Sequence, residues 1–333
     1  MEKYSPLVSI LIPSYQVEEF ILATVESAAS QTYSKIEIIA VADGCTDGTV
    51  DILRDYGRHD SRLHIIALDK NEGVHLARVR AMSAAQGEFV GFLDADDWLQ
   101  PEFVERMVSA MTLGHADIVI CGIRYATKDG TQGVHKVRFG RSELVDKDIL
   151  RRFCDLGFGT GSLCNKLYRR EAIEPFLSQD FGETVPINED YIVNFGAFAT
   201  AKRVCLLSNT LYFYRQHPSS VTASSHRAKV FALMLRAYIV CLETYVGRIS
   251  QAEELVDTLY AAQFHYDAYR VDSRIALTEY ADHIAESLKR LAIIHPTAIY
   301  GLMHLFEKPA RRPSLLWCIL RSVVRRAKSL FSN

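Results

Sequence analysis

The sequence predicts an α/β fold over residues 1–225, with a mostly parallel sheet covered by helices on both faces, followed by a helical region over residues 226–333. Two observations predict this division. Apolar segments of strand length alternate with segments of helical periodicity from residue 8 to residue 93, which is typical of βαβ units. Beyond residue 226 only helical periodicity remains. Because ligands of such sheets bind at the carboxyl ends of the strands, we look for functional residues there.

The predicted elements follow from the spacing of apolar residues. The strands are expected at Val8–Ile12, Ile36–Val41, Leu63–Ala67 and Phe89–Leu93, and the helices between them at Glu18–Ser30, Thr49–Tyr56 and Val74–Ala85. Residues 112–225 mix short strands and helices, as expected of a second half of the same domain. The C-terminal helices are expected at Ala228–Val246, Gln251–Arg270, Ile275–Ile294 and Ser314–Phe331.

Composition narrows the class of protein. The net charge of −2 gives no electrostatic support for a general nucleic-acid binder. The 7 cysteines are dispersed without a CxxC pair, which indicates reduced thiols in a cytoplasmic protein. The N-terminus lacks the pattern of a signal peptide, and no apolar run reaches the ~18–20 residues that span a bilayer. We therefore expect a cytoplasmic protein, soluble or peripheral to the membrane.

Three carboxylates follow the fourth predicted strand, in the motif FLDADDW at residues 92–98. Acids this close repel one another, and burying one without a partner is costly. A divalent cation relieves the repulsion, and hard oxygen ligands suit Mg²⁺ or Mn²⁺. Such a metal would bridge the phosphates of a nucleotide donor and neutralise the departing diphosphate. The alternative is a solvated acidic turn that caps the helix beginning near Pro101.

Two weaker signals follow other strands. Asp43 and Gly44 end the second strand, where the carboxylate would accept the N3–H of uracil and the glycine would let the base approach. A turn in which Asp43 bonds its own backbone explains the pair equally well. Pro13 and Tyr15 follow the first strand, where the tyrosine ring would stack on the base. A plain turn also explains this pair.

Six stretches occur together in the order and spacing of one known family: VSILIPSY, SAASQTYSKIEIIAVADG, CTDGT, NEGVHLARVRAM, GEFVGFLDADDW and PEFVERM. On this basis, residues 8–110 resemble the donor half of the family 2 glycosyltransferases. These are inverting enzymes with the GT-A fold, which is built on a Rossmann-like, mostly parallel sheet. No single stretch is specific, and their joint order carries the resemblance.

The resemblance implies that Pro13, Tyr15 and Asp43 hold the uridine of a UDP-sugar donor. Two departures from the family pattern weaken this assignment. Ala42 stands where the family often has the first of two acids, and Gln16 stands where it commonly has asparagine.

The resemblance also assigns roles near the diphosphate. It implies that Arg78 approaches the diphosphate or the base, and that Asp94 lies near the ribose or sugar hydroxyls. Asp96 would bind Mn²⁺ or Mg²⁺, and Asp97 would share or replace that role.

An inverting transfer needs a group that removes the proton of the acceptor hydroxyl. The acids Glu189 and Asp190 enter a helix predicted at Tyr191–Phe198. By resemblance the catalytic base is Asp190, with its neighbour Glu189 as second choice. The alternative is that Asn188 and Glu189 merely cap the helix.

Two further stretches, CNKLYRR at 164–170 and YFYRQHPSS at 212–220, resemble the acceptor half of the family. Arg215 would pair with phosphate in bidentate fashion. His217 would bind the metal or the diphosphate, although a lone histidine is more often structural. Lys166 is either a surface charge or a substrate contact.

The segment Pro309–Asn333 contains six cations and no acid. Its apolar residues recur at helical spacing, so it predicts a helix with one apolar and one basic face. Such a helix suits the surface of an anionic bilayer, and the alternative is a helix packed on its own domain. We expect peripheral attachment at the inner face of the cell membrane, where a lipid-linked acceptor would be found.

Together these features predict a metal-dependent inverting hexosyl- or N-acetylhexosaminyltransferase. It would move a sugar from a UDP-sugar to a glycan or lipid-linked oligosaccharide in bacterial capsule, exopolysaccharide or lipopolysaccharide synthesis. The alternative is a catalytically silent GT-A protein that binds a sugar nucleotide or a partner, and the intact Asp94, Asp96 and Asp190 argue against it. A nicotinamide-dependent oxidoreductase would need a GxGxxG turn, which IPSYQVEE lacks.

Overall fold

The structure, a computed structural model, describes residues 5–217, 227–268 and 280–298. The chain divides into two compact units. Residues 1–180 and 193–217 form the first unit, which contains the sheet, and residues 181–192 with those from 218 onward form the second. The predicted boundary at residue 225 lies outside the described residues. The sequence did not predict that residues 181–192 group with the C-terminal helices.

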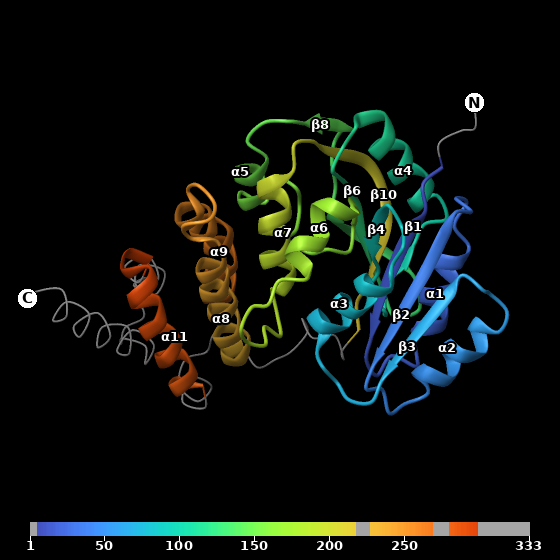
Figure 1. Cartoon of the computed structure of the whole chain (residues 1–333), viewed down its shortest axis with the longest axis horizontal. Coiled ribbons are helices and arrows are strands. Elements are labelled where there is room, and N and C mark those ends of the chain that lie inside the picture. The colour runs from blue at the N-terminus through green and yellow to red at the C-terminus, as the bar shows by residue number, and fades with distance from the viewer. Residues whose placement is uncertain (1–4, 218–226, 269–279, 299–333) are drawn as a thin grey trace, which may run out of the picture. The chain divides into compact units, whose positions relative to one another are not determined.

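The first unit is built on a ten-stranded sheet with the order β3-β2-β1-β4-β9-β6-β10-β5, in which β7 also pairs with β6 and β8 with β10 (Figure 1). The parallel strands are β1 (Val8–Ser14), β2 (Ile36–Asp43), β3 (Leu63–Leu68), β4 (Phe89–Phe92), β6 (Ile118–Ala126) and β10 (Val204–Arg215). The antiparallel strands are β5 (Trp98–Leu99), β7 (Gln132–Val137), β8 (Glu143–Val145) and β9 (Lys166–Arg169). The predicted mostly parallel sheet is confirmed.

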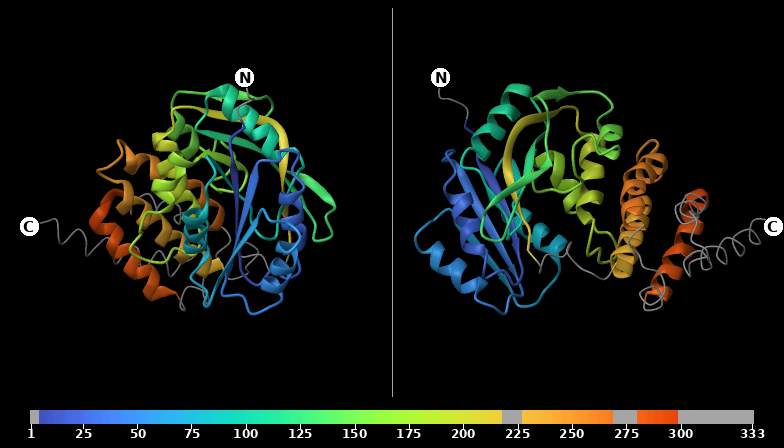
Figure 2. Two further views of the ribbon diagram at one scale, coloured as in Figure 1. Left: turned by 45° about the vertical axis from the view of Figure 1, so that its right-hand side comes forward. Right: turned by 180° about the vertical axis from the view of Figure 1, so that it is seen from behind.

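Helices cover both faces of this sheet, as predicted. Helices α1 (Ile21–Ala29) and α2 (Thr49–Gly57) lie on one face of strands β1–β3, and α3 (Val74–Ala84) lies on the other (Figures 1 and 2). The two faces follow from right-handed crossovers, because the chain moves outward from β1 to β3 and then returns to β4. Helix α4 (Phe103–Gly114) packs against β6 and β10.

The core lies where the sequence is continuously apolar. Strands β1 and β2 are buried along their whole length, as expected of strands covered on both faces. The second half of the first unit adds α5 (Ile149–Cys154), α6 (Arg170–Leu177) and most of α7 (Glu189–Thr200). The first residues of α7 belong to the second unit.

The second unit consists of helices α8 (Arg227–Tyr245), α9 (Ala252–Ala268) and α11 (Ala281–Ile294), with α8 packed against the other two. Residues 181–192 are tied to these helices. The Tyr245 hydroxyl donates to the Ile192 carbonyl (2.8 Å), and Glu183 pairs with Arg236 and Arg290. Three of the four predicted C-terminal helices are thus found, and the fourth lies outside the described residues. None of the helices described here is long and apolar enough to cross a bilayer.

Candidate functional site

The site is built at one edge of the sheet, where parallel strands end together. Strand β1 pairs in parallel with β2 on one side and β4 on the other, so the residues after all three strands gather at the same edge. Strand β10 also reaches this edge, because its antiparallel pairing with β5 places Phe213 beside Trp98. The Trp98 and Phe213 rings stack with centroids 5.2 Å apart.

The turn that carries the three acids is held in one conformation. The Asp97 amide donates to the Asp94 carbonyl (3.0 Å), which closes the turn. The Thr24 hydroxyl of α1 lies 2.9 Å from the Ala95 carbonyl and 2.8 Å from the Asp97 carbonyl. Helix α1 therefore holds the backbone of this turn.

Asp97 is the buried member of the three. Its side chain is fully buried, the Tyr212 hydroxyl donates to Oδ2 (2.7 Å) and the Arg215 amide donates to Oδ1 (2.8 Å). Burial raises the pKa of Asp97, and the charges of Asp96 and Asp94 raise it further. Both oxygens are engaged with β10, so Asp97 joins the turn to that strand. A metal-binding role for Asp97 stays a prediction.

Asp96 lies next to two residues predicted from the sequence, Arg215 at the end of β10 and His217 two residues beyond it. His217 Nε2 is 2.8 Å from Asp96 Oδ2, and Arg215 Nε donates to the Asp96 carbonyl oxygen (2.7 Å). The imidazole packs on the Phe20 ring, with centroids 4.6 Å apart, and the Arg215 guanidinium lies over Trp98 at 4.5 Å. The structure thus brings Asp96 together with two residues that follow it by about 120 positions in the chain.

Asp94 and Arg78 form the next pair along the edge. Arg78, on the buried side of α3, is 6% exposed, and its guanidinium lies 3.3 Å from Asp94 Oδ1. The Asp94 side chain is 33% exposed and therefore accessible to a ligand. An arginine predicted to approach a diphosphate thus stands beside one of the acids of the motif.

Asp43 has a role that neither sequence interpretation included. Its carboxylate is buried and accepts the backbone N–H groups of Glu72 (2.7 Å) and Gly73 (2.9 Å) at the start of α3. Gly44, at φ 65°, allows the close approach of this loop, because a Cβ there would lie 2.2 Å from the Asn71 nitrogen. Asp43 therefore positions the loop that leads to Arg78. Its contact with uracil remains a prediction.

The two other predicted base contacts differ in accessibility. Pro13 is buried within β1, where it pairs with Val41, whereas the Tyr15 side chain is 51% exposed. The departure at Gln16 has a structural explanation. Its side chain bonds to Thr46, accepting from the Thr46 amide (2.8 Å) and donating to the hydroxyl (2.8 Å), and so links the β1 turn to the β2 turn.

The donor groups fit a divalent cation whose coordination is completed by a substrate. Among the described residues no cluster of three or more histidine, cysteine or acidic side chains is arranged to hold a metal by itself. Asp96 and His217 supply one carboxylate oxygen and one imidazole nitrogen at adjoining positions. Mg²⁺-type sites commonly use one or two carboxylates together with substrate phosphates, and imidazole extends the choice to Mn²⁺.

The acid pair Glu189 and Asp190 begins α7, within the second unit. Asn188 precedes it with φ 60°, a left-handed conformation that asparagine tolerates. Glu189 is 5% exposed, whereas Asp190 is half-buried and its Oδ1 accepts the Tyr191 amide (2.9 Å). The catalytic roles of both acids stay predictions.

Sequence reasoning misjudged Lys166 and missed Tyr212. Lys166 is neither a surface charge nor exposed to substrate: it is fully buried and donates to the Thr160 carbonyl (3.2 Å) and Asn165 Oδ1 (3.0 Å). The Tyr212 hydroxyl donates to Asp97 and accepts a hydrogen bond from the Asp94 amide (3.2 Å). In the sequence, Tyr212 is one of several aromatic residues in the stretch YFYRQHPSS, and nothing else there indicates its role.

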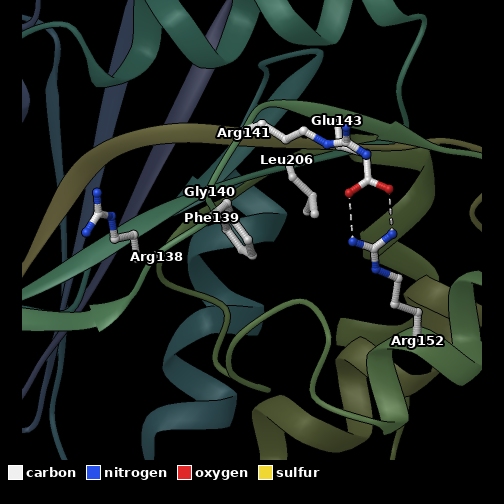
Figure 3. Close-up of a pocket in the computed structure, with 7 residues that line it drawn as sticks. All are labelled: Arg138, Phe139, Gly140, Arg141, Glu143, Arg152 and Leu206. Atoms are coloured by element: carbon white, nitrogen blue, oxygen red, sulfur yellow. Dashed lines mark hydrogen bonds and ion pairs between the residues drawn. The ribbon is translucent and has the colours of Figure 1, made fainter.

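A separate hollow of about 380 Å³ lies away from these residues (Figure 3). Its lining is Arg138, Phe139, Gly140, Arg141, Glu143, Arg152 and Leu206. Arg152 makes two hydrogen bonds to Glu143 (2.8 and 2.9 Å), which lower the pKa of that carboxyl. Leu206 is near the start of β10 and Arg215 is at its end, a span of about 30 Å of extended strand.

Comparisons with known proteins agree with this architecture. Residues 9–177 match the family described as glycosyl transferase family 2, and the chain belongs to that family. The protein EpsH of Bacillus subtilis (strain 168) is 34% identical over 70% of this chain and 67% of its own length.

Two solved structures share the fold. One is S. aureus TarS 1–349 in complex with UDP-GlcNAc, which superposes with a TM-score of 0.70 at 18% identity, covering 97% of this chain and 91% of that one. The other is the Pyrobaculum calidifontis mannosyltransferase PcManGT in complex with GDP-Man and Mn²⁺, with a TM-score of 0.54 at 15% identity, covering 98% of this chain and 88% of that one.

Proposed function

We propose that the protein is an inverting glycosyltransferase that moves a sugar from a UDP-sugar to a hydroxyl group of a glycan or lipid-linked glycan. The observation that carries this proposal is the contact between Asp96 and His217 (2.8 Å), with Arg215 bonded to the same turn and Arg78 beside Asp94. Two carboxylates, two guanidinium groups and an imidazole at one sheet edge suit a diphosphate with its counter-ion.

The donor would bind along this edge. The exposed ring of Tyr15 offers a stacking surface for the base, and Asp43 retains acceptor capacity for uracil N3–H. Arg78 and Arg215 would supply positive charge to the diphosphate. Binding of UDP-GlcNAc by TarS, which shares the fold, supports a uridine donor.

Asp96 and His217 are the residues that would hold a divalent cation, and the Mn²⁺ complex of PcManGT supports its presence. The cation would neutralise charge that develops on the leaving diphosphate.

Asp190 would act as the base. It accepts the proton of the acceptor hydroxyl while that oxygen forms a bond to the anomeric carbon, opposite the breaking bond to the diphosphate. Attack from that side inverts the anomeric configuration. Glu189, which is more deeply buried, is the second choice for this role.

The cellular setting is also a proposal. We infer a role in bacterial surface polysaccharide synthesis from the family and from the Bacillus subtilis (strain 168) relative TuaG, which is named for teichuronic acid biosynthesis and is 37% identical over 39% of this chain and 52% of its own length. The protein would work in the cytoplasm at the inner face of the membrane, held there by the basic segment 309–333. That segment lies outside the described residues, so its contribution is tested by vesicle binding of the full chain.

Turnover of a panel of UDP-sugars tests the proposal. Purified protein is incubated with each donor in Mn²⁺ or EDTA, and released UDP and donor binding are measured with and without glycan acceptors. Metal-dependent UDP release from one donor, lost in Asp96→Ala, is the expected result. Absence of binding by every donor would overturn the donor site. Donor binding without turnover, when lipid-linked acceptors are also supplied, would favour a silent binding protein.

A further inference from the structure

A lysine and two tyrosines form a cluster that none of the donor-site assignments uses. The Lys136 ammonium lies 3.6 Å from the Tyr214 ring centroid and 5.8 Å from that of Tyr125. The two rings meet edge to face, 5.8 Å apart and at 83°. All three side chains are half-buried, so each keeps part of its surface open to a ligand. We refer to these residues as the Lys136 cluster.

Strand geometry places this cluster beside the acids. Side chains two residues apart point to the same face of a strand, so Tyr214 shares a face of β10 with Tyr212. Tyr212 reaches Asp97 and the Asp94 amide from that face. Tyr125 of β6 is the register partner of Tyr214.

A buried thiol supports the same placement. Burial raises the pKa of Cys164, the charges of Asp94 and Asp97 raise it further, and the charge of Lys136 lowers it. All three charges thus act on the same buried thiol. The Lys136 cluster adjoins the donor carboxylates within the first unit.

The charge of the surrounding hairpin is unbalanced. Residues 124–141 contain five lysines and arginines but a single acid, Asp129, in a chain with net charge −2. That acid accepts hydrogen bonds from its own turn, at the Thr131 amide (3.1 Å) and the Thr127 hydroxyl. Among the described residues no carboxylate is within ion-pair distance of Lys136, whose ammonium contacts only aromatic faces.

We propose that the Lys136 cluster binds the acceptor and that the acceptor is a saccharide carrying an anionic group, either a carboxylate or a phosphate. This inference rests on the proposed function of the neighbouring donor site. The tyrosine rings offer apolar faces for the C–H groups of a sugar ring. A lysine ammonium is a compact charge that attracts either anion without demanding a fixed planar geometry.

Equilibrium binding to four probes tests the proposal in the presence of saturating UDP. The probes are a glucuronic acid tetrasaccharide, its carboxyl-reduced counterpart, GlcNAc 1-phosphate and methyl GlcNAc. The wild-type chain should bind at least one anionic probe more tightly than its neutral counterpart. Lys136→Gln should weaken that probe about tenfold, as expected for one lost charge-assisted hydrogen bond, and should leave the neutral probes and UDP unchanged. The probe that responds distinguishes carboxylate from phosphate.

Arg141→Gln is the matched control, because it removes a cation from the same segment at the hollow of Figure 3. An equal loss of affinity for the anionic probe in both variants would mean that the probe responds only to the long-range charge of the segment. That result would overturn a contact at Lys136. Equal binding of charged and neutral probes by the wild-type chain would also overturn the proposal. Lys136→Arg should restore most of the affinity. Failure of UDP itself to bind would count against the proposed function. Binding of the four probes would then be compared in the absence of nucleotide, with the same outcomes for the Lys136 cluster.

Discussion

This protein has two acidic segments, the turn at residues 94–97 and the pair at residues 189–190. Asp96 and Asp97 of the turn have identified partners on and after β10, whereas Asp190 of the pair bonds to the neighbouring Tyr191 amide. The two segments nevertheless share one feature. In each, one carboxylate is buried and a neighbour is more exposed: Asp97 at 0% lies beside Asp96, and Glu189 at 5% lies beside Asp190. In the first segment the buried acid binds the backbone of β10, and the exposed acid meets His217. Burial thus separates the acid that binds β10 from the acid beside His217, and we expect a similar division between Glu189 and Asp190.

The largest expected effect comes from separating Asp190 from Glu189. Asp190→Asn should lower kcat by about 10²–10⁴, because removal of a general base loses that much, while the Kd of the UDP-sugar stays unchanged. Glu189→Gln should retain more activity and chiefly lower the unfolding midpoint. Steady-state kinetics, donor binding and thermal unfolding would be compared. The division would be reversed if Glu189→Gln were inactive with an intact fold while Asp190→Asn remained active.

The same comparison within the turn pairs Asp96 with Asp97. Asp96→Asn should abolish the dependence of turnover on Mn²⁺ and lower activity by about 10²-fold or more, as expected when a charged group that binds the metal is lost. Asp97→Asn should cost about 1–3 kcal/mol of unfolding free energy, because the amide cannot accept from both Tyr212 and Arg215. Metal titrations and denaturant unfolding measure the two effects. A variant at Asp97 with normal stability but no metal response would contradict the structural role.

The smallest expected effect concerns a contact in the second unit between the buried His295 and the partly exposed Asp257. His295 Nε2 lies 3.0 Å from Asp257, and this hydrogen bond raises the pKa of His295 above its ordinary value. Because the folded-state pKa is raised, the stabilisation is complete below the unfolded value of about 6.5 and is lost as pH rises through the folded value. The unfolding midpoint of the wild-type chain should therefore fall over this window.

His295→Gln should flatten that pH dependence, and His283→Gln provides the control, since His283 is exposed on α11, the helix that His295 caps at its C-terminal end. Thermal unfolding at several pH values is the measurement. An unchanged pH profile in His295→Gln would show that the pair with Asp257 does not stabilise the folded chain.

Several site residues could be placed from the sequence because they follow strands directly. Asp94 and Asp96 come after a short apolar run that must be buried, so their position at the sheet edge follows from the βαβ pattern. Arg215 and His217 lie in a stretch recognised as similar to the family, and the structure brings both to Asp96. Lys166 was misjudged because a lysine is rarely buried, and only its bonds to Thr160 and Asn165 explain the exception.

The sequence by itself determined the parallel sheet, its covering helices and the acids at its edge, because hydrophobic periodicity and the alternation of strand and helix segments along the chain are local properties. Only the tertiary structure decided which acid is buried. Asp97 and Asp96 are adjacent in the chain, and their environments differ because Tyr212 and Arg215, more than 100 residues later, close over one of them. Asp43 likewise received its partners, Glu72 and Gly73, from a loop that only packing brings near. Burial depends on contacts between distant segments, and no local pattern specifies them.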